Sequence, residues 1–411
     1  MQSPTIDKIV LTRGQRLLAL FPNVSPVAAR NLFLFPLFIA SAAVLFVSAN
    51  SVYTRLSKPF PLDWWESMFI VDAARAIHGQ PVYEKVGAGH ATHMYGPLGT
   101  YTMAAIYRVT GVIVNAGRWL ALIGGIGSTL LFVLAFVEKR TLVYLLIGTA
   151  FFVSLHIRCV DLFTNTRPDA FAFLLSTIAL LAAYRAVERA QPIWYLVTAS
   201  LTVIAFLYKQ PYAVTALVPP LAVFFIRPRA MKRQLITSFI PLAMMVVAGI
   251  TLKLGFRNVW FYMVTVPRLY GVSLIRMRLG IECLFMYNTI YLAIVSLIVL
   301  GAGIEHLRDS KTKWLFASMI IGGGMGILAF AKHGGTYNSL LMVYAPAAAF
   351  CMLKLPQAVE VMMTSKINLI TRAVCSVSLA FMLTGTAFGT PLMWRLAFDH
   401  ASNTEDFAKA V

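Results

Sequence analysis

The sequence predicts an all-α membrane protein with about eleven transmembrane helices and short interfacial helices in its first external loop. The 411-residue chain is 59% hydrophobic and only 12% charged, whereas soluble domains carry about 25% charged residues. Its mean hydropathy is +0.75. Apolar runs recur along the whole chain, and most approach the roughly 20 residues that a helix needs to cross a bilayer.

The candidate spanning segments follow one another with short polar gaps. Some adjoin a proline turn, at Gln191 and Pro192 or at Gln210 and Pro211, so their predicted ends are approximate. The expected spans are residues 31–52, 115–137, 141–159, 168–188, 192–208, 211–226, 234–255, 283–304, 314–331, 336–354 and 368–390.

The basic residues in the gaps predict which side each gap faces, because Lys and Arg clusters stay in the cytoplasm. We place the basic N-terminal segment in the cytoplasm. The later basic clusters then also face the cytoplasm, provided that residues 98–113 do not cross the membrane. We therefore expect 98–113 to form an interfacial helix on the outer face. The later clusters are Lys139/Arg140, Arg185/Arg189, Arg227/Arg229/Lys232/Arg233, Arg308/Lys311/Lys313 and Lys354/Lys366.

This sidedness makes residues 53–114 an external loop that carries interfacial helices. Residues 1–411 then form a single integral-membrane domain without a soluble domain, because no gap is long and little chain follows Pro391. The net charge of +19 indicates contacts with membrane lipids and not with nucleic acid, because the basic residues flank apolar runs. The other expected external turns are 160–167, 209–211, 256–282 and 332–336.

The first external loop concentrates carboxylates, which chemistry on a polar substrate needs. Asp63 suits the N-cap of a helix that begins at Trp64, and Glu66 suits the reciprocal position of a capping box. An N-cap carboxylate is also held in place and kept ionised by the helix dipole, as a general base requires. On this pattern alone, capping and catalysis both remain open.

Several polar residues at the other external turns are candidates for substrate binding. Taken singly, each of these turns has a structural explanation. Pro97 and Pro168 suit the first turn of a helix, and the Lys209 side chain can extend its ammonium to the membrane surface. Together they place cations beside carboxylates at one membrane face, which favours anion binding next to a base. The candidates are His93, Tyr95, Arg167, Asp169, Lys209, Gln210, Arg268, Arg276 and His333.

The sequence predicts no metal site and no required cofactor. His90 and His93 are three residues apart with Glu84 near, so a helix would align them for a divalent ion. Gly87 and Gly89 disfavour a helix at that point. The four cysteines form no CxxC or CxxH pattern, and the chain has no DxD motif for a metal–diphosphate complex.

The order of the external motifs resembles the GT-C superfamily of integral-membrane glycosyltransferases, which includes the protein mannosyltransferases. An acidic pair in the first external loop is followed by AIHGQPVY and then YGPL. Later turns read NTRPDAFAFLLSTIALL, LYKQPYAV and KHGGTYNSLLMVYAPAAAF, in the family's order. The resemblance covers roughly residues 60–350.

The resemblance implies an inverting transfer of a sugar from a polyprenyl-phosphate carrier, with Asp63 as the base and Glu66 as its alternative or partner. Family members commonly place Lys or His before the proline of YGPL, where this chain has Gly96. Lys209, Arg268 and Arg276 therefore become the candidates for contacting the donor phosphate.

The resemblance also implies a setting. The expected partners are a polyprenyl-phosphate sugar as donor, a lipid-linked or small glycan as acceptor, and membrane lipids. The expected location is a bacterial inner membrane, with the active site on the external, periplasmic face. The absence of a large external domain in the sequence favours such small acceptors over a protein acceptor.

Two other functions fit the apolar bulk of the chain. A transporter or flippase for a lipid-linked saccharide or another solute would place charges and broken helices near the bilayer midplane, whereas these charges gather at one face. An O-antigen-ligase-like enzyme would use Arg and His in a late external loop. Residues 256–282 contain Arg268, Arg276 and Arg278 but no His.

The topology is tested by cysteine labelling in a background without the four native cysteines. We expect Gly89→Cys to react with a membrane-impermeant maleimide added outside, because residues 53–114 are predicted to be external. Arg229→Cys is the matched control and should react only after the membrane is permeabilised. Labelling of Arg229→Cys from outside would contradict the predicted sidedness.

Overall fold

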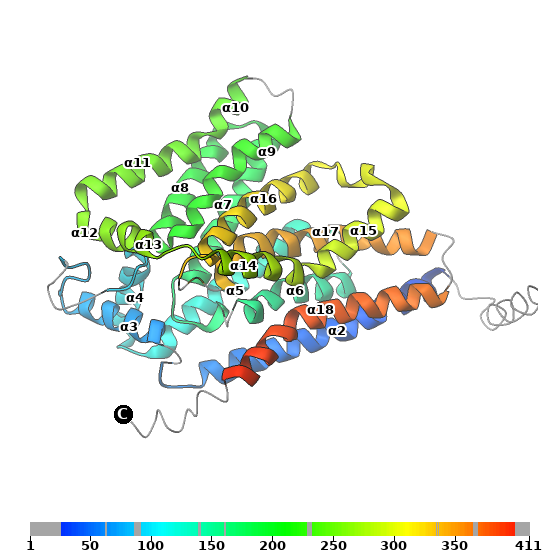
Figure 1. Ribbon diagram of the computed structural model, residues 1–411, viewed down its shortest axis with the longest axis horizontal. Coiled ribbons are helices and arrows are strands. Elements are labelled where there is room, and N and C mark those ends of the chain that lie inside the picture. The colour runs from blue at the N-terminus through cyan, green and yellow to red at the C-terminus, as the bar shows by residue number, and fades with distance from the viewer. Residues whose placement is uncertain are drawn as a thin grey trace, which may run out of the picture.

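The protein is a bundle of helices, as a computed structural model shows (Figure 1). The described part of the chain contains no β-strand, only an isolated antiparallel bridge between Val272 and Lys332. Its apolar helices make it an all-α integral membrane protein, as the sequence predicts. The structure describes residues 26–61, 64–85, 92–138, 141–159, 162–227, 232–333, 335, 337–364 and 369–398.

The helices follow one another with short connections. In chain order they are α2 (Pro26–Leu56), α3 (Trp64–Ile77), α4 (Pro97–Thr110), α5 (Val114–Phe136), α6 (Leu142–Arg158), η1 (Leu162–Thr164), α7 (Asp169–Arg189), α8 (Pro192–Tyr208), η2 (Gln210–Leu217), α9 (Val218–Ile226), α10 (Lys232–Ser238), α11 (Ile240–Gly255), α12 (Arg257–Trp260), η3 (Phe261–Thr265), α13 (Val266–Leu269), α14 (Leu274–Tyr287), α15 (Thr289–Ala302), η4 (Ile304–Leu307), α16 (Ser310–Phe330), η5 (Tyr337–Leu340), α17 (Leu341–Thr364) and α18 (Leu369–Phe398).

Six helices of the described chain are long and apolar enough to cross a bilayer. A seventh results if Leu274–Met286 and Thr289–Ala302, which are bent by 53°, act as one span. Every segment predicted to span overlaps one of these or a shorter apolar helix. The six are Val27–Leu56, Val114–Phe136, Asp169–Arg189, Lys232–Gly255, Ser310–Phe330 and Tyr337–Met363; the shorter ones are Leu142–Leu155, Pro192–Tyr208, Gln210–Ile226 and Thr371–Gly385.

Helix α17 forms the centre of the bundle. Within Tyr337–Met363, 94% of the most apolar stretch is buried inside the protein, and α17 packs against α16, α15 and α6. A second group places α7 between α5 and α8. Helices α2 and α18 lie side by side along one edge, although they come from opposite ends of the chain (Figure 1).

Short helices gather at one end of the bundle, where α3, α4, α12 and α13 lie together (Figure 1). Helix α4 is the segment expected to be interfacial. Its 14 residues extend about 21 Å, which is less than the roughly 30 Å hydrocarbon core of a bilayer. This length is less than a spanning helix needs, and the interfacial location of α4 remains a prediction.

Helix α10 and the connection between α15 and α16, which the sequence predicts to face the cytoplasm, lie away from α3 and α4 (Figure 1), and we call this the basic end. The Lys354 ammonium lies 2.6 Å from Asp309 Oδ2 and donates to the His306 carbonyl at 2.8 Å. Arg227 Nη2 donates to the Glu188 carbonyl at 3.0 Å. These contacts connect the start of α16 to α17, and the end of α9 to α7, so basic residues at this end also hold neighbouring helices together.

Gly96 joins the loop before α4 to the end of α8. Its backbone N–H donates to the Tyr208 carbonyl at 3.1 Å. A Cβ atom at Gly96 would lie 1.9 Å from the Leu207 carbonyl oxygen, far inside the contact distance. The glycine of YGPL is therefore required by close backbone packing.

We expect Gly96→Ala to lower the free energy of unfolding by about 1–3 kcal/mol, the usual cost of overpacking, because a backbone carbonyl cannot move aside as a side chain can. The measurement is the melting temperature of the detergent-solubilised protein. Gly324→Ala is the matched control, since a Cβ atom there has no neighbour within 4 Å. Equal melting temperatures for both variants would contradict the packing argument.

Candidate functional site

The turns predicted to be external meet at the end of the bundle that carries α3 and α4. Each of the four turns contacts the first loop or another of the four. Thr166 N–H donates to Glu66 Oε1 at 2.9 Å, and Asn258 Nδ2 donates to the Tyr83 carbonyl at 3.0 Å. The His333 N–H donates to the Gly271 carbonyl at 3.1 Å. Residues far apart in sequence thus build one polar end.

A buried ion pair between Glu66 and Arg118 lies at the base of this end. Both side chains are fully buried. Arg118 donates two hydrogen bonds to the carboxylate, from Nε to Oε1 at 2.9 Å and from Nη2 to Oε2 at 2.7 Å. The same guanidinium donates to the carbonyls of Arg55 at 2.8 Å, Lys58 at 2.7 Å and Phe60 at 2.8 Å. It therefore fixes the path of the chain between α2 and α3.

These contacts assign Glu66 a structural role that capping alone did not predict. Its carboxylate is enclosed by Arg118 and the Thr166 N–H, and an arginine partner favours the ionised form. Asp63, the predicted base, lies outside the described residues, immediately before α3 begins at Trp64. The catalytic roles of Asp63 and Glu66 remain predictions.

A second buried ion pair connects Asp169 with Lys209. Asp169 is at the start of α7, and Lys209 is in the turn between α8 and η2. Asp169 Oδ1 also accepts a hydrogen bond from Asn338 Nδ2 at 2.9 Å, while Asp169 Oδ2 is buried and has no hydrogen-bond partner among the described residues. Burial lowers the pKa of Lys209, and the Asp169 carboxylate opposes that shift.

His93 is buried in a polar cluster beneath the first loop. Its Nδ1 accepts from the Tyr95 N–H at 3.1 Å, so Nε2 carries the proton and donates to Thr100 Oγ1 at 2.7 Å. Asp72 Oδ2 lies 3.6 Å from Nε2 and accepts from the His93 N–H at 3.2 Å. Burial lowers the pKa of His93 to about 4, against the opposing effect of Asp72, and the imidazole is neutral at pH 7.

Tyr95 and Gln210 connect this cluster to the Lys209 turn. The Lys209 ammonium lies 5.1 Å from the centre of the Tyr95 ring, within the range of a cation–π contact. Gln210 Nε2 donates to the Met94 carbonyl and, at 2.8 Å, to the Met263 carbonyl. Gln210 therefore ties three segments together.

The other predicted binding residues are Arg167, Arg268, Arg276 and His333. The Arg167 guanidinium lies 6.0 Å from the centre of the Trp65 ring. Arg276 donates to the carbonyls of Phe330, at 3.3 Å, and of Gly335. Arg268 and the side chain of His333 are exposed. The structure thus brings His93, Tyr95, Asp169, Lys209 and Gln210 together, with Arg167 nearby. Among the described residues, Arg268 on α13, Arg276 on α14 and His333 in the turn after α16 make no hydrogen bond or ion pair with these five residues.

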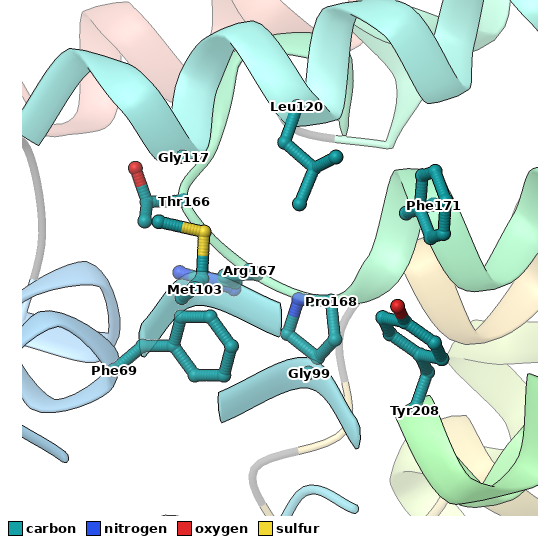
Figure 2. Close-up of a pocket in the computed structure, with 10 residues that line it drawn as sticks. All are labelled: Phe69, Gly99, Met103, Gly117, Leu120, Thr166, Arg167, Pro168, Phe171 and Tyr208. Atoms are coloured by element: carbon teal, nitrogen blue, oxygen red, sulfur yellow. The ribbon is translucent and has the colours of Figure 1, made fainter. Parts of the chain in front are cut away.

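A narrow crevice lies between α3, α4 and α5 on one side and the start of α7 and end of α8 on the other. Figure 2 shows Phe69, Pro168 and Tyr208 around it, with Leu120 above and Arg167 beside Pro168. Its volume of about 10 Å³ suffices for about one water molecule. In this conformation the crevice is closed to a sugar.

No group of three or more His, Cys, Asp or Glu side chains suited to a metal ion occurs in the described ranges. Of the residues considered for a divalent ion, His93 and Glu84 are engaged elsewhere: His93 with Thr100 and Asp72, and Glu84 with Arg75 at 2.5 Å. His90 lies outside the described residues.

Sequence reasoning missed three residues that build the site: Arg118, Asp72 and Asn338. Arg118 lies inside α5, four residues from its start, where a charge in an apolar run signals a partner within the protein. Asp72 is the only acidic residue in the last two turns of α3, which was a weak signal. Asn338 carried no signal that a single sequence provides.

No protein-family model matches the chain, and no curated protein shows significant similarity to it. What this membrane protein does is therefore inferred from its own residues and their geometry.

We expect Glu66→Gln to lower the free energy of unfolding by about 3–5 kcal/mol, because the substitution leaves the buried Arg118 charge without its counter-ion. Thermal unfolding in detergent measures the loss. Glu84→Gln is the matched control: it breaks the Arg75 pair, whose side chains are 22% and 17% exposed, and we expect a smaller effect. If Glu66→Gln unfolds at the wild-type temperature, Arg118 does not depend on this carboxylate.

We expect the protein to lose about 2 kcal/mol of stability between pH 7.5 and pH 5 through His93. The native pKa of about 4 lies below the usual 6.5. The unfolded chain therefore binds a proton first as the pH falls, and the stability present above pH 6.5 is lost on the way to pH 4. His93→Gln should flatten this pH dependence of the melting temperature, whereas the exposed His78→Gln should leave it unchanged. An unaltered slope in His93→Gln would exclude His93 as its source.

Proposed function

We propose that the protein is a membrane glycosyltransferase of the GT-C type that transfers a sugar from a polyprenyl-phosphate carrier to a lipid-linked or small glycan acceptor. The observation that supports this most is the convergence of five separate polar segments at one end of an apolar bundle. A hydrophobic carrier chain belongs beside such a bundle, and its phosphate and sugar belong at its polar end.

The proposed roles follow from the chemistry of the transfer. The Asp63 carboxylate takes the proton of the acceptor hydroxyl while that oxygen forms a bond to the anomeric carbon. The bond from the anomeric carbon to the phosphate oxygen breaks, and the polyprenyl phosphate leaves as an anion. A back-side attack of this kind inverts the anomeric centre.

Cations at the polar end would stabilise the charge of the leaving phosphate. We propose that at least one of Lys209, Arg268 and Arg276 makes this contact. Lys209 is the best placed, because it lies beside Tyr95 and within the cluster that joins α7, α8 and the first loop. Its pairing with Asp169 holds the ammonium in position, and Arg276 would have to exchange its two carbonyl partners for the phosphate.

The proposal includes a topology of eleven crossings, with the polar end on the external face of a bacterial inner membrane. In this topology the six long apolar helices, the bent pair counted once and the four shorter apolar helices would each cross the bilayer. In support, the contacts of Lys354 and Arg227 lie at the basic end and those of Glu66 and Lys209 lie at the polar end.

We expect Asp63→Asn to reduce turnover by roughly 10²–10⁴ while leaving the melting temperature almost unchanged, because the amide keeps the shape but cannot accept the proton. The assay incubates purified protein with a panel of polyprenyl-phosphate sugars and quantifies released polyprenyl phosphate by mass spectrometry.

Glu84→Gln provides a matched loss of one carboxylate from the same loop and should keep wild-type turnover. An active Asp63→Asn protein together with a folded but inactive Glu66→Gln protein would move the role to Glu66. If no donor in the panel releases polyprenyl phosphate, and the protein moves a labelled lipid-linked sugar across proteoliposome membranes, the results would instead favour a flippase.

A further inference from the structure

An uncompensated group of cations borders the polar end. Residues 253–282 contain five cations and a single carboxylate. Within them, Lys253 at the end of α11, Arg257 on α12 and Arg268 on α13 are exposed, and we call these three the cationic rim. The five cations are Lys253, Arg257, Arg268, Arg276 and Arg278, and the carboxylate is Glu282.

The cationic rim has no internal counter-charge in the described chain. Glu282 is already paired with Arg278, at 2.8 Å. Carboxylates of the neighbouring elements already have partners: Glu66 pairs with Arg118, Asp169 with Lys209, and Glu84 with Arg75. Asp72 is buried and accepts hydrogen bonds from Thr92 and from the His93 N–H. None of the three rim residues makes an ion pair or side-chain hydrogen bond with another described residue.

The segment that carries the rim is fastened to the polar end. Asn258, next to Arg257, donates to the Tyr83 carbonyl at 3.0 Å. Lys332 Nζ donates to the carbonyl of Pro267, next to Arg268, at 3.4 Å. Buried Tyr262 packs with Val82 and Tyr83. The rim therefore keeps a fixed position relative to the first loop, as the neighbouring places of α3, α4, α12 and α13 illustrate (Figure 1).

We infer that the cationic rim binds an anionic acceptor, a glycan or lipid-linked glycan that carries carboxylate or phosphate groups. This inference rests on the proposed function. Guanidinium groups match carboxylates and phosphates geometrically, and exposed cations of one sign attract an anionic substrate over a distance. Outer loops normally avoid Lys and Arg, so membrane insertion does not explain cations at a proposed external end.

The test measures binding separately from turnover. Full-length protein is placed in nanodiscs of phosphatidylcholine, which lack anionic lipid, and titrated into a fluorescent oligogalacturonate and into a neutral malto-oligosaccharide of equal length. We expect salt-sensitive binding of the anionic probe alone. Lys253→Gln/Arg257→Gln should weaken it about fivefold, since each exposed contact contributes modestly.

Lys232→Gln/Arg233→Gln removes the same charge at the opposite end and should leave binding unchanged. Equal binding of both sugars, or equal losses of affinity in both double variants, would overturn the inference.

A fluorescent short-chain polyprenyl phosphate tests whether the rim binds the acceptor or the carrier. If Lys253→Gln/Arg257→Gln weakens binding of this probe more than binding of oligogalacturonate, the rim binds the donor phosphate and the inference is overturned. If binding of the anionic probe depends on the rim but the protein releases no polyprenyl phosphate from any donor, the rim is still an anion-binding site and the proposed function is rejected.

Discussion

The Glu66–Arg118 ion pair is the constraint on which the polar end depends. One guanidinium holds a carboxylate on α3, a carbonyl at the end of α2 and two carbonyls of the chain between α2 and α3. The same carboxylate accepts from Thr166, just before α7. Removing a charge from such a pair is costly because the remaining charge stays buried. The position of α3 therefore follows from a charge placed in α5.

Much of the fold was predictable, because its cause is simple. Long apolar segments must become helices in a bilayer, since lipid offers their backbone groups no hydrogen bonds. The predicted interfacial helix at 98–113 corresponds to α4, Pro97–Thr110. The number of crossings was less predictable. Segments such as 192–208 and 211–226 lie near the length limit, and Asn288 lies at the bend between α14 and α15, where helix length alone does not decide between a bent span and two shorter helices.

The candidate site was predictable in part. Sidedness grouped Asp169, Lys209 and Gln210 at one face before any contact was known, and the structure places them together. Their partners were not predictable, because pairing depends on which helices are neighbours. His93 illustrates the difference: its spacing from His90 suggested a ligand, whereas its contacts with Thr100, Asp72 and Tyr95 make it a buried support for the loop.

The pairing of α2 with α18 bears on how the protein is made. The Ser376 hydroxyl on α18 donates a hydrogen bond to the Phe33 carbonyl on α2, across 343 residues of sequence. Of these two helices, α2 leaves the ribosome long before α18 does. During synthesis the inward surface of α2, including the buried Phe33 and Leu37, must therefore remain against lipid or an insertion chaperone until the last described helix arrives. Of the described helices, the first to be synthesised thus acquires this neighbour only after the last has been made.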